Sequence, residues 1–366
     1  MSKLLMISGD RAFAQGKRGA FYSTLEEFHK YWERIDIIVP KIETRDKRQE
    51  TNFFNNVYVH SSPWPIIFQP WFILRKGLEI FKQNRFDLVT VQEYAPLYNG
   101  WGARMLWHKI RIPYILEIHH ITGYPKPSGL KESFYLWLFK IFIKSDSSKA
   151  TKIRIVNQNE TPDFLVKCGI AREKIAYMPS LYIDLDIFKP MGLDKKYDLI
   201  FVGRLAENKG IDLFLKAVKE IDAEAIIVGS GSLEKKLKTI SHKLKANVIF
   251  HGWAKDSREV AELMNQSKLL VMPSYSEGGP RVVLEAMACG VPVLATRVGI
   301  VPDLEKTGAL EIIGWNTGDI SRKAKKLLTN DVRYGQLSKL GAQTAKQFEK
   351  RSAIENYASK LKAVLD

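Results

Sequence analysis

Short apolar runs alternate with longer mixed segments along the first half of the chain. The runs are LLMIS at 4, IDIIV at 35, NVYVH at 56, FDLVTV at 86, IPYILEI at 112 and KIRIVN at 152. Such runs, bounded by turn residues, are typical of buried strands in a parallel sheet. Between them, residues 23–32, which open with Ser-Thr-Leu-Glu-Glu, and residues 72–81 are predicted helices. The order of strand, helix and strand predicts a parallel α/β domain.

The second half repeats this alternation. Its apolar runs are YDLIFVG at 197, EAIIVG at 224, NVIFHG at 247, KLLVMP at 268, VPVLAT at 291 and ALEII at 309. Turn-forming residues between 178 and 196 interrupt the pattern. We therefore predict two Rossmann-like parallel-sheet domains, residues 1–190 and residues 191–366. The final amphipathic helix, residues 354–365, is a candidate to pack back on the first domain.

The composition agrees with two folded domains. A chain of 366 residues exceeds the roughly 250 to 300 residues that one hydrophobic core organises. Two cysteines, Cys168 and Cys289, are too few for a disulfide framework, which indicates a reducing compartment. The apolar stretches at 63–74 and 134–143 are shorter than the roughly 18 to 20 residues that cross a bilayer. The opening run is also shorter than the core of a signal peptide, so we expect a cytoplasmic protein.

The formal net charge of +16 favours polyanionic partners, which include nucleic acid, anionic lipid head groups and phosphorylated substrates. The positive charge is spread over both halves, and no nucleic-acid-binding motif is recognisable. We therefore expect no nucleic acid partner. A basic nucleic-acid-binding protein remains the non-enzyme alternative.

The densest group of candidate functional residues is PSYSEGGPRVVLEAMACGVPV, residues 273–293. A predicted strand leads through Glu277, Gly278 and Gly279 into a helix that contains Glu285. Glycines before a helix start expose backbone N–H groups, which bind phosphate and other anions. This segment therefore predicts an anion site at the carboxyl end of a strand.

Two further loops follow predicted strands and suit an anionic ligand. In FVGRLAENKGI, residues 201–211, the guanidinium of Arg204 and the ammonium of Lys209 together suit a diphosphate. In the first half, Gly16 and Gly19 of AQGKRGAFYSTL would let the backbone approach a ligand closely. Open parallel sheets bind ligands beyond the carboxyl ends of their strands, where all these loops are expected.

These motifs together resemble the family 4 retaining glycosyltransferases of GT-B architecture. The resemblance rests on the E-x7-E spacing of Glu277 and Glu285, on FVGRL with a following Lys-Gly, on PS-x-x-EG and on EAMACGVPVLAT. In the first half, IPYILEIHH is similar to the family strand that ends in a catalytic-site histidine, which matches His119. The resemblance implies that the two Rossmann-like domains face each other across a cleft.

For the nucleotide part of a nucleotide-diphospho-sugar donor, the resemblance implies four contacts. Arg204 and Lys209 would bind the diphosphate, and Glu285 would bind the ribose hydroxyls. Trp253, in HGWAKD, would be a neighbour of the base. The nucleotide is expected to be UDP or GDP.

For the donor sugar, the resemblance implies a site between two walls. His119 would contact the sugar from the first domain, and Glu277, with the amides of Gly278 and Gly279, from the second. His119 and Glu277 are thus the predicted catalytic residues. The motif that commonly reads IPNGVD is MPSLYID here, and Gly299-Ile300 replaces a common Gly-Gly, so the sugar is not specified.

The resemblance implies a retaining, metal-independent hexosyltransferase that needs no cofactor besides its donor. Its acceptor would be a glycan or a lipid-linked glycan, in the biosynthesis of a cell-surface polysaccharide or glycolipid. A sugar-nucleotide epimerase or a phosphorylase of the same architecture remains an alternative. A dinucleotide-dependent oxidoreductase is disfavoured, because Glu234 stands where the third glycine of the G-x-G-x-x-G fingerprint would follow Gly229 and Gly231.

Two stretches of the first half combine aromatic and basic residues, PWPIIFQPWFILRK and FYLWLFKIFIKSDSSK. One hypothesis is peripheral contact with the anionic inner face of the cell membrane, for which aromatic and lysine side chains are suited. The other is that these aromatic residues pack in the core around a site for a soluble acceptor.

Overall fold

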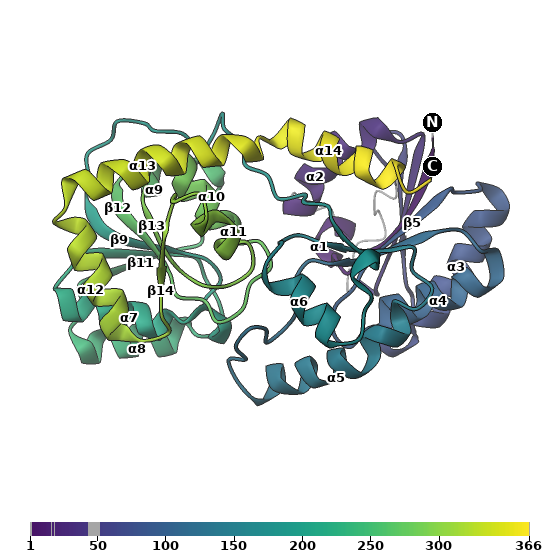
Figure 1. Cartoon of the computed structure of the whole chain (residues 1–366), viewed down its shortest axis with the longest axis horizontal. Helices are drawn as coiled ribbons and strands as arrows, with labels where there is room; N and C mark the ends of the chain where they lie inside the picture. Colours follow the sequence, from purple (N-terminus) through teal and green to yellow (C-terminus); the bar gives the residue numbers. More distant parts are fainter. Residues whose placement is uncertain (1, 16, 18, 43–51, 366) are drawn as a thin grey trace.

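A computed structural model describes residues 2–15, 17, 19–42 and 52–365 as two α/β domains, each built on its own sheet (Figure 1). The strand order is β3-β4-β2-β1-β5-β6-β7-β8 in the first sheet and β11-β10-β9-β12-β13-β14 in the second. Neighbouring strands in these sheets are parallel, except for the short antiparallel pair β3 and β4. The predicted fold, with two Rossmann-like parallel-sheet domains, is confirmed.

The first domain contains the following elements. Its strands are β1 (Lys3–Ile7), β2 (Arg34–Val39), β3 (Asn52–Phe53), β4 (Val57–Ser61), β5 (Leu88–Gln92), β6 (Tyr114–Ile118), β7 (Lys152–Ile155) and β8 (Ile175–Tyr177). Its helices are α1 (Arg11–Ala14), α2 (Ala20–Phe28), α3 (Gln69–Gln83), α4 (Tyr98–Ile110), α5 (Leu130–Asp146) and α6 (Glu160–Lys167).

The second domain contains the remaining strands. They are β9 (Tyr197–Val202), β10 (Ala225–Val228), β11 (Val248–Gly252), β12 (Ser267–Met272), β13 (Val293–Thr296) and β14 (Glu311–Ile313). The helices that follow β9 along the chain are α7 (Ile211–Ile221), α8 (Glu234–Leu244), α9 (Ser257–Asn265), α10 (Arg281–Ala288), α11 (Val301–Glu305), α12 (Thr317–Leu328), α13 (Asp331–Ala345) and α14 (Lys350–Lys362).

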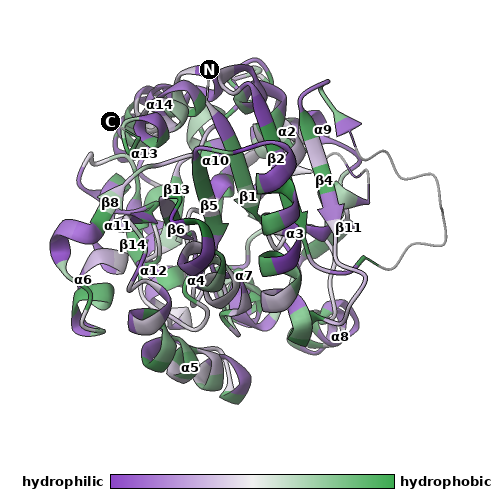
Figure 2. Ribbon diagram, turned by 90° about the vertical axis from the view of Figure 1, so that its right-hand side faces the viewer, coloured by the Kyte–Doolittle hydropathy of each residue, from purple (hydrophilic) through white to green (hydrophobic). Residues whose placement is uncertain are grey.

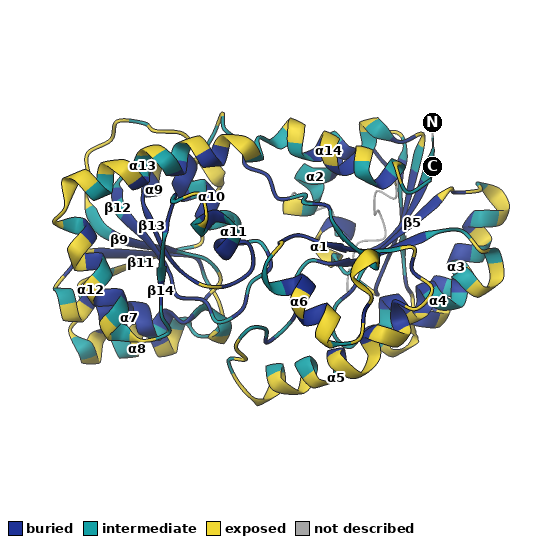
Figure 3. Cartoon of the chain, in the orientation of Figure 1, coloured by how far each residue is buried: buried dark blue, intermediate teal, exposed yellow. Residues whose placement is uncertain are grey.

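The strands form the cores of both domains because their apolar side chains are covered on two faces. The central strands β1, β6 and β13 are buried along almost their whole length. In Figure 2 these strands are hydrophobic, and Figure 3 shows the two sheets as the buried layer between helices whose outer faces are exposed. No helix within the described residues is long and apolar enough to cross a membrane.

The start of α2 differs from the prediction. The Ser-Thr-Leu-Glu-Glu sequence was expected to open a helix at residue 23, but α2 begins at Ala20 after Gly19. The Thr24 hydroxyl lies inside the helix and donates to the Ala20 carbonyl at 2.9 Å. A hydroxyl that bonds back to the preceding turn does not cap a helix start, so this part of the prediction was wrong.

The chain crosses between the domains at two neighbouring places. It leaves the first domain between β8 and β9, where the boundary near residue 190 was predicted, and returns between α13 and α14. The two crossing segments touch, because the Ile183 N–H donates to the Phe348 carbonyl at 2.7 Å. Helix α14 then packs beside α2 on the first domain, as Figure 1 shows.

Helix α14 belongs to the core of the first domain. Its residues Ile354, Tyr357 and Leu361 are at most 3% exposed and join the cluster that contains Leu25 and Phe28 of α2. The rings of Tyr357 and Phe28 stack with centroids 5.1 Å apart. The last helix of the chain therefore completes a domain that the first residues began.

Shortening a buried side chain of α14 should destabilise the first domain. We expect Leu361→Ala, at a site with no exposure, to lower the free energy of unfolding by roughly 2 to 5 kcal/mol, because it leaves a cavity. Denaturant unfolding would measure this effect against Asn356→Ala, on the exposed face of the same helix. Equal stability of the two variants would contradict the assignment of α14 to this core.

Candidate functional site

Two cavities lie at the carboxyl ends of the strands, one in each domain. The first, of about 280 Å³, is lined by polar residues that follow or end β1, β5 and β6, with others from β7 and α14. The polar residues are Asp10, Gln92, Glu117, His119, Arg154 and Tyr357, among others. The second cavity, of about 650 Å³, is lined by residues that follow β9, β10 and β11. Parallel sheets bind ligands at these strand ends.

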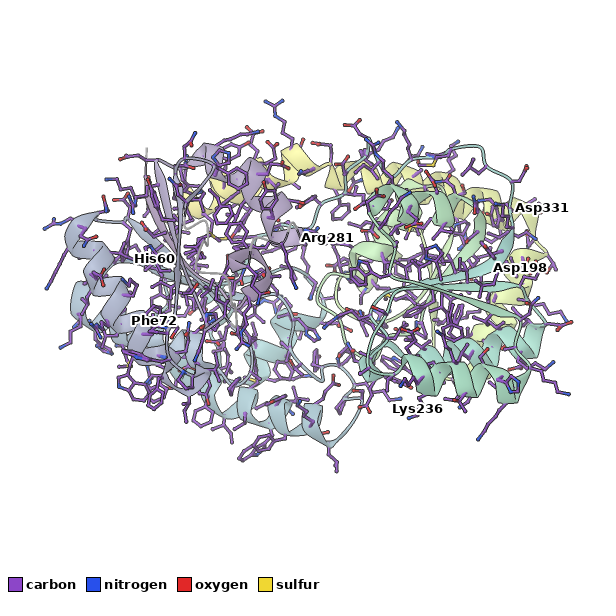
Figure 4. The ribbon with its side chains drawn as sticks, turned by 180° about the vertical axis from the view of Figure 1, so that it is seen from behind. His60, Phe72, Asp198, Lys236, Arg281 and Asp331 are labelled. Atoms are coloured by element: carbon purple, nitrogen blue, oxygen red, sulfur yellow. The ribbon has the colours of Figure 1, made fainter. Side chains whose placement is uncertain are left out.

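Arg281 lines both cavities. It is the first residue of α10, and Figure 4 shows it between the two domains. Its guanidinium lies 4.2 Å from the centre of the Tyr182 ring. In the described part of the chain no carboxylate lies within ion-pair distance of it. A cation without a partner carboxylate therefore lies where the cavities meet.

The two loops predicted to bind a donor are joined in the structure. Lys209 donates to the Glu277 carboxylate, and both side chains are largely buried. The Tyr275 N–H donates to the Asn208 carbonyl at 2.8 Å, which ties the two backbones. Gly210 has a φ of +62°, and a Cβ there would lie 2.2 Å from the Pro273 carbonyl oxygen. The tight turn after Lys209 therefore requires glycine, and it brings the ammonium to Glu277.

His119 and Gly278 meet across the domain boundary. A Cβ added to Gly278 would lie 1.7 Å from the His119 carbonyl oxygen, closer than any two such atoms approach. Only glycine therefore allows the second domain's loop this position. The predicted catalytic pair His119 and Glu277 comes from the two segments that meet here.

The imidazole of His119 lies over a buried ion pair. Glu117 and Arg154 are paired residues of β6 and β7, both 1% exposed, and their atoms Oε1 and Nη1 are 3.0 Å apart. Burial alone would raise the pKa of Glu117, but the Arg154 charge, together with the contacts to His119 and Tyr357, outweighs burial and lowers the pKa to about 2. The Glu117 carboxylate thus stays ionised at any physiological pH.

Glu285 lies one turn into α10, with its carboxylate partly shielded from solvent. Burial raises the pKa of Glu285 to about 7, against which the Arg281 charge acts. No hydrogen bond to this carboxylate is made by any residue that the structure describes. The carboxylate oxygens of Glu285 are therefore free to accept hydrogen bonds from a ligand.

His120 and two serines contribute further unpaired polar atoms. Nε2 of His120, Oγ of Ser274 and Oγ of Ser276 are buried without a hydrogen-bond partner in the described residues. Burial lowers the pKa of His120, so its ring is neutral at pH 7. Buried polar atoms are usually paired, so these three indicate room for ligand or water contacts around the Glu277 loop.

A second interdomain contact lies beside the Glu277 loop. Glu160, the first residue of α6, accepts a hydrogen bond from the Gly299 N–H at 2.8 Å. The Gln158 N–H donates to Asp303 at 2.8 Å. A Cβ at Gly299 would lie 2.2 Å from the Gly278 carbonyl oxygen, so this segment packs directly on the Glu277 loop. The first domain thus supports that loop from a second side.

The structure places the other predicted site residues as follows. Arg204 and Trp253 line the larger cavity, and the Trp253 side chain is 71% exposed. Gly279 packs on Leu181, and Gly19 precedes α2, where a Cβ would meet nothing within 4 Å. The predicted residue Gly16 lies outside the described residues. Gly19 therefore need not be glycine for steric reasons, unlike Gly278.

Of the residues that line the smaller cavity the sequence reasoning found only His119, and it missed the polar residues Asp10, Glu117, Arg154 and Tyr357 among others. An arginine inside the apolar run KIRIVN was the available signal, since a charged residue in a buried strand needs a partner. Glu117, two residues before His119, lies on the same face of β6 and was a second signal.

Family models match both domains. The model described as Glycosyltransferase Family 4 matches residues 25–180, and the model described as Glycosyl transferases group 1 matches residues 184–350. An uncharacterized glycosyltransferase of Methanocaldococcus jannaschii is 28% identical over 330 residues, which cover 88% of each chain.

Two further similarities extend over nearly the whole chain. The N,N'-diacetylbacillosaminyl-diphospho-undecaprenol alpha-1,3-N-acetylgalactosaminyltransferase of Campylobacter jejuni is 24% identical over 354 residues, covering 89% of this chain and 90% of the relative. The structure of Anabaena HepE in complex with UDP-glucose is similar with a TM-score of 0.77 and 17% identity, covering 99% of this chain and 100% of HepE.

The contact between Glu160 and Gly299 should weaken as pH rises. Burial raises the pKa of Glu160 from 4.5 to about 7, although the hydrogen bond from the Gly299 N–H acts against this rise, so the buried arrangement as a whole favours the protonated carboxyl. Separation of the domains removes the part of this burial that the second domain provides, and the pKa of Glu160 then falls toward its ordinary value. The equilibrium constant for the contact should therefore fall by at most about tenfold per pH unit from about 4.5 to about 7, and then stay level.

Amide hydrogen exchange of residues 297–303, corrected for the intrinsic pH dependence of exchange, measures this. Protection should be greater at pH 5.5 than at pH 7.5 in the native chain. Glu160→Gln keeps an acceptor for the Gly299 N–H but does not titrate, so its protection should change less. Identical pH profiles for the two proteins would contradict the prediction.

Proposed function

The chain belongs to the family 4 glycosyltransferases of GT-B architecture, and we propose that it is a retaining, metal-independent hexosyltransferase. Its donor is a UDP- or GDP-sugar, and it uses no further cofactor. Its acceptor is a glycan or a lipid-linked glycan in cell-surface polysaccharide or glycolipid biosynthesis. The C. jejuni relative, whose name specifies a diphospho-undecaprenol acceptor, supports the lipid-linked choice.

This proposal rests mainly on one observation, which is that the ion pair of Lys209 and Glu277 lies opposite His119. A partly buried ammonium, a carboxylate and the interdomain approach of Gly278 meet beside the larger cavity's Arg204. Cations at the end of a parallel sheet suit a diphosphate. The complex of HepE with UDP-glucose, on the same fold, supports a donor of this class.

The donor's parts are assigned by chemistry along the second domain. The base lies in the larger cavity near Trp253, the ribose hydroxyls bind the free oxygens of Glu285, and the diphosphate binds Arg204 and Lys209. The amides of Gly278 and Gly279, before the start of α10, face the donor sugar with Glu277. His119 reaches the sugar from the first domain.

In the transfer step the bond between the sugar's C1 and the β-phosphate oxygen breaks, and a bond from C1 to the acceptor oxygen forms on the same face. The acceptor's proton moves to the departing phosphate. Arg204 and Lys209 stabilise the negative charge that develops on the nucleoside diphosphate. Glu277 is not the nucleophile in this scheme, because its carboxylate is paired with Lys209. It orients the ammonium and the donor sugar.

Donor turnover measures this function directly. We expect hydrolysis of, or transfer from, a UDP- or GDP-sugar in the presence of EDTA, with release of the free nucleotide. Glu285→Ala should weaken nucleotide binding by roughly tenfold or more, because the ribose loses hydrogen bonds to a charged group. Glu262→Ala, at an exposed position of α9, is the matched control. Activity lost with EDTA and restored by magnesium would overturn the metal-independent mechanism, and donor isomerisation without transfer would favour an epimerase.

The first domain also presents a surface that suits a membrane. Helix α5 leaves Leu130, Phe134, Trp137, Ile141 and Phe142 between 47% and 91% exposed. The same helix exposes lysines, and its outer face is exposed in Figure 3. Nearby on α3 and α4, Trp71 and Trp101 are also exposed, with ring centroids 5.2 Å apart. Aromatic and basic side chains together favour the interface of an anionic bilayer.

We therefore place the protein on the cytoplasmic face of the cell membrane, held reversibly through the α5 surface. Each lysine near an anionic surface contributes roughly 1 kcal/mol, so a few suffice for reversible attachment. A lipid-linked acceptor would then meet the first domain at the membrane. With a soluble acceptor, no such attachment is needed.

Liposome co-sedimentation tests the membrane surface. At low salt the native protein should sediment with anionic phosphatidylglycerol vesicles and remain free of neutral phosphatidylcholine vesicles. Replacing both Phe134 and Trp137 by Ser should release most of the bound protein, because the apolar contact is lost. Val332→Ser, which removes an exposed apolar side chain from α13, should leave binding unchanged. Absence of lipid-dependent binding would remove the membrane proposal and leave the transferase intact.

A further inference from the structure

We propose that Tyr357, on the C-terminal helix, is a positioning residue that acts through Glu117 and Arg154 to hold the His119 ring with its proton on Nδ1. The inference deepens the proposed function, on which the role of His119 at the donor sugar rests. It assigns a part in that site to residues outside the motifs of the second domain.

The contact between Arg154 and His119 fixes which ring nitrogen carries the proton. Nη1 of Arg154 lies 2.7 Å from Nε2 of His119. A guanidinium has only donors and stays charged, so Nε2 must accept, and a neutral ring then carries its proton on Nδ1. In the other arrangement the Nε2–H of His119 would donate to Glu117 at 3.4 Å. That N–H would then lie against an N–H of Arg154, and the two donors would repel each other. The shorter distance favours the first arrangement.

All three guanidinium nitrogens of Arg154 donate hydrogen bonds. Its Nε donates to the Met178 carbonyl at 2.7 Å, and its Nη2 donates to the Ser180 hydroxyl at 2.5 Å. Its Nη1 donates to Glu117 at 3.0 Å as well as to His119. The β6 and β7 register pairs Glu117 with Arg154, so both charges face the same side of the sheet. The guanidinium therefore has one orientation, and it imposes that orientation on the imidazole.

Tyr357 closes the network from α14. Its hydroxyl donates to Oε1 of Glu117 at 2.5 Å, the same oxygen that Arg154 binds. Its ring lies beneath the guanidinium, with 4.2 Å between the ring centre and Cζ of Arg154. The Phe28 ring also stacks with the Tyr357 ring, which restricts the rotation of Tyr357. Tyr357 thus contacts both members of the ion pair and is itself fixed by the core.

The consequence for the site concerns the face of His119 that meets a ligand. Glu117, Arg154 and Tyr357 all line the smaller cavity together with His119, whose side chain is 43% exposed. Since Nε2 is occupied, the ring offers a ligand its Nδ1–H as a hydrogen-bond donor. His119 is then suited to hold a sugar or acceptor oxygen and not to remove a proton through Nε2.

The tautomer of His119 can be measured without substrate. Long-range proton–nitrogen correlation spectra of the 15N-labelled protein distinguish Nδ1–H, Nε2–H and charged imidazoles, and His119→Gln identifies the signal. At pH 7 we expect the Nδ1–H form in the native protein. Tyr357→Phe keeps the ring but removes the hydroxyl, and it should yield a mixture of forms. Tyr334→Phe, which removes a hydroxyl bonded to the Lys268 carbonyl in the second domain, should leave the signal unchanged.

Kinetics provide the second readout. Tyr357→Phe should lower kcat for donor turnover by roughly tenfold, while the nucleotide Kd stays within about twofold because the second domain is untouched. Arg154→Lys retains the positive charge and should recover part of the activity that Arg154→Gln loses. A charged or Nε2–H His119 in the native protein would overturn the inference. So would a Tyr357→Phe variant with native spectra and native kcat. If the protein turned over no donor but showed the Nδ1–H signal, the proposed function would be wrong, while the inference that Tyr357 positions His119 would still stand.

Discussion

The buried ion pair of Arg154 and Glu117 is the interaction on which the site edge of the first domain depends. Removing two charges from water costs several kcal/mol per ion, which is offset only when every donor and acceptor is paired. Here Arg154 joins β6 and β7 to residues 178–180, the start of the segment that leads into the second domain. Loss of either partner would strand a charge at a cost of about 3 to 5 kcal/mol. The pair therefore fixes the place where the chain leaves the first domain.

The second domain approaches this edge through backbone, not through long side chains. Gly278 lies against the His119 carbonyl, and Gly299 lies against Gly278. Two cations lie near this approach: Lys209, which is paired with Glu277, and Arg281, which has no carboxylate partner among the described residues. Close backbone packing gives the two walls a fixed separation, and Arg281 leaves an unpaired positive charge in the space between them.

The sequence predicted those features of the protein that are determined by residues close together along the chain. Period and turn residues were sufficient for the second sheet and for all strands of the first sheet except the short edge strands β3 and β8. The loops with Lys209 and Glu277 could be found because each directly follows a strand. The network around His119 could not, since it joins residues from three distant segments. Glu117 and Arg154 meet only through the register of β6 and β7, and Tyr357 only because α14 returns from the second domain. The position of Arg281 between the two cavities likewise needed the relative placement of the domains.

The neighbouring crossings at Ile183 and Phe348 have a consequence for how such enzymes diversify. Both chain termini lie at the first domain, and the second domain leaves and re-enters at adjacent points (Figure 1). In topological terms the second domain is an insertion between β8 and α14 of the first domain, its host. An insertion with adjacent ends can be exchanged as one segment, because the host needs only its two cut points to stay close. Recombination at these two points could exchange the whole second domain, while the first domain stays unchanged, in a single event.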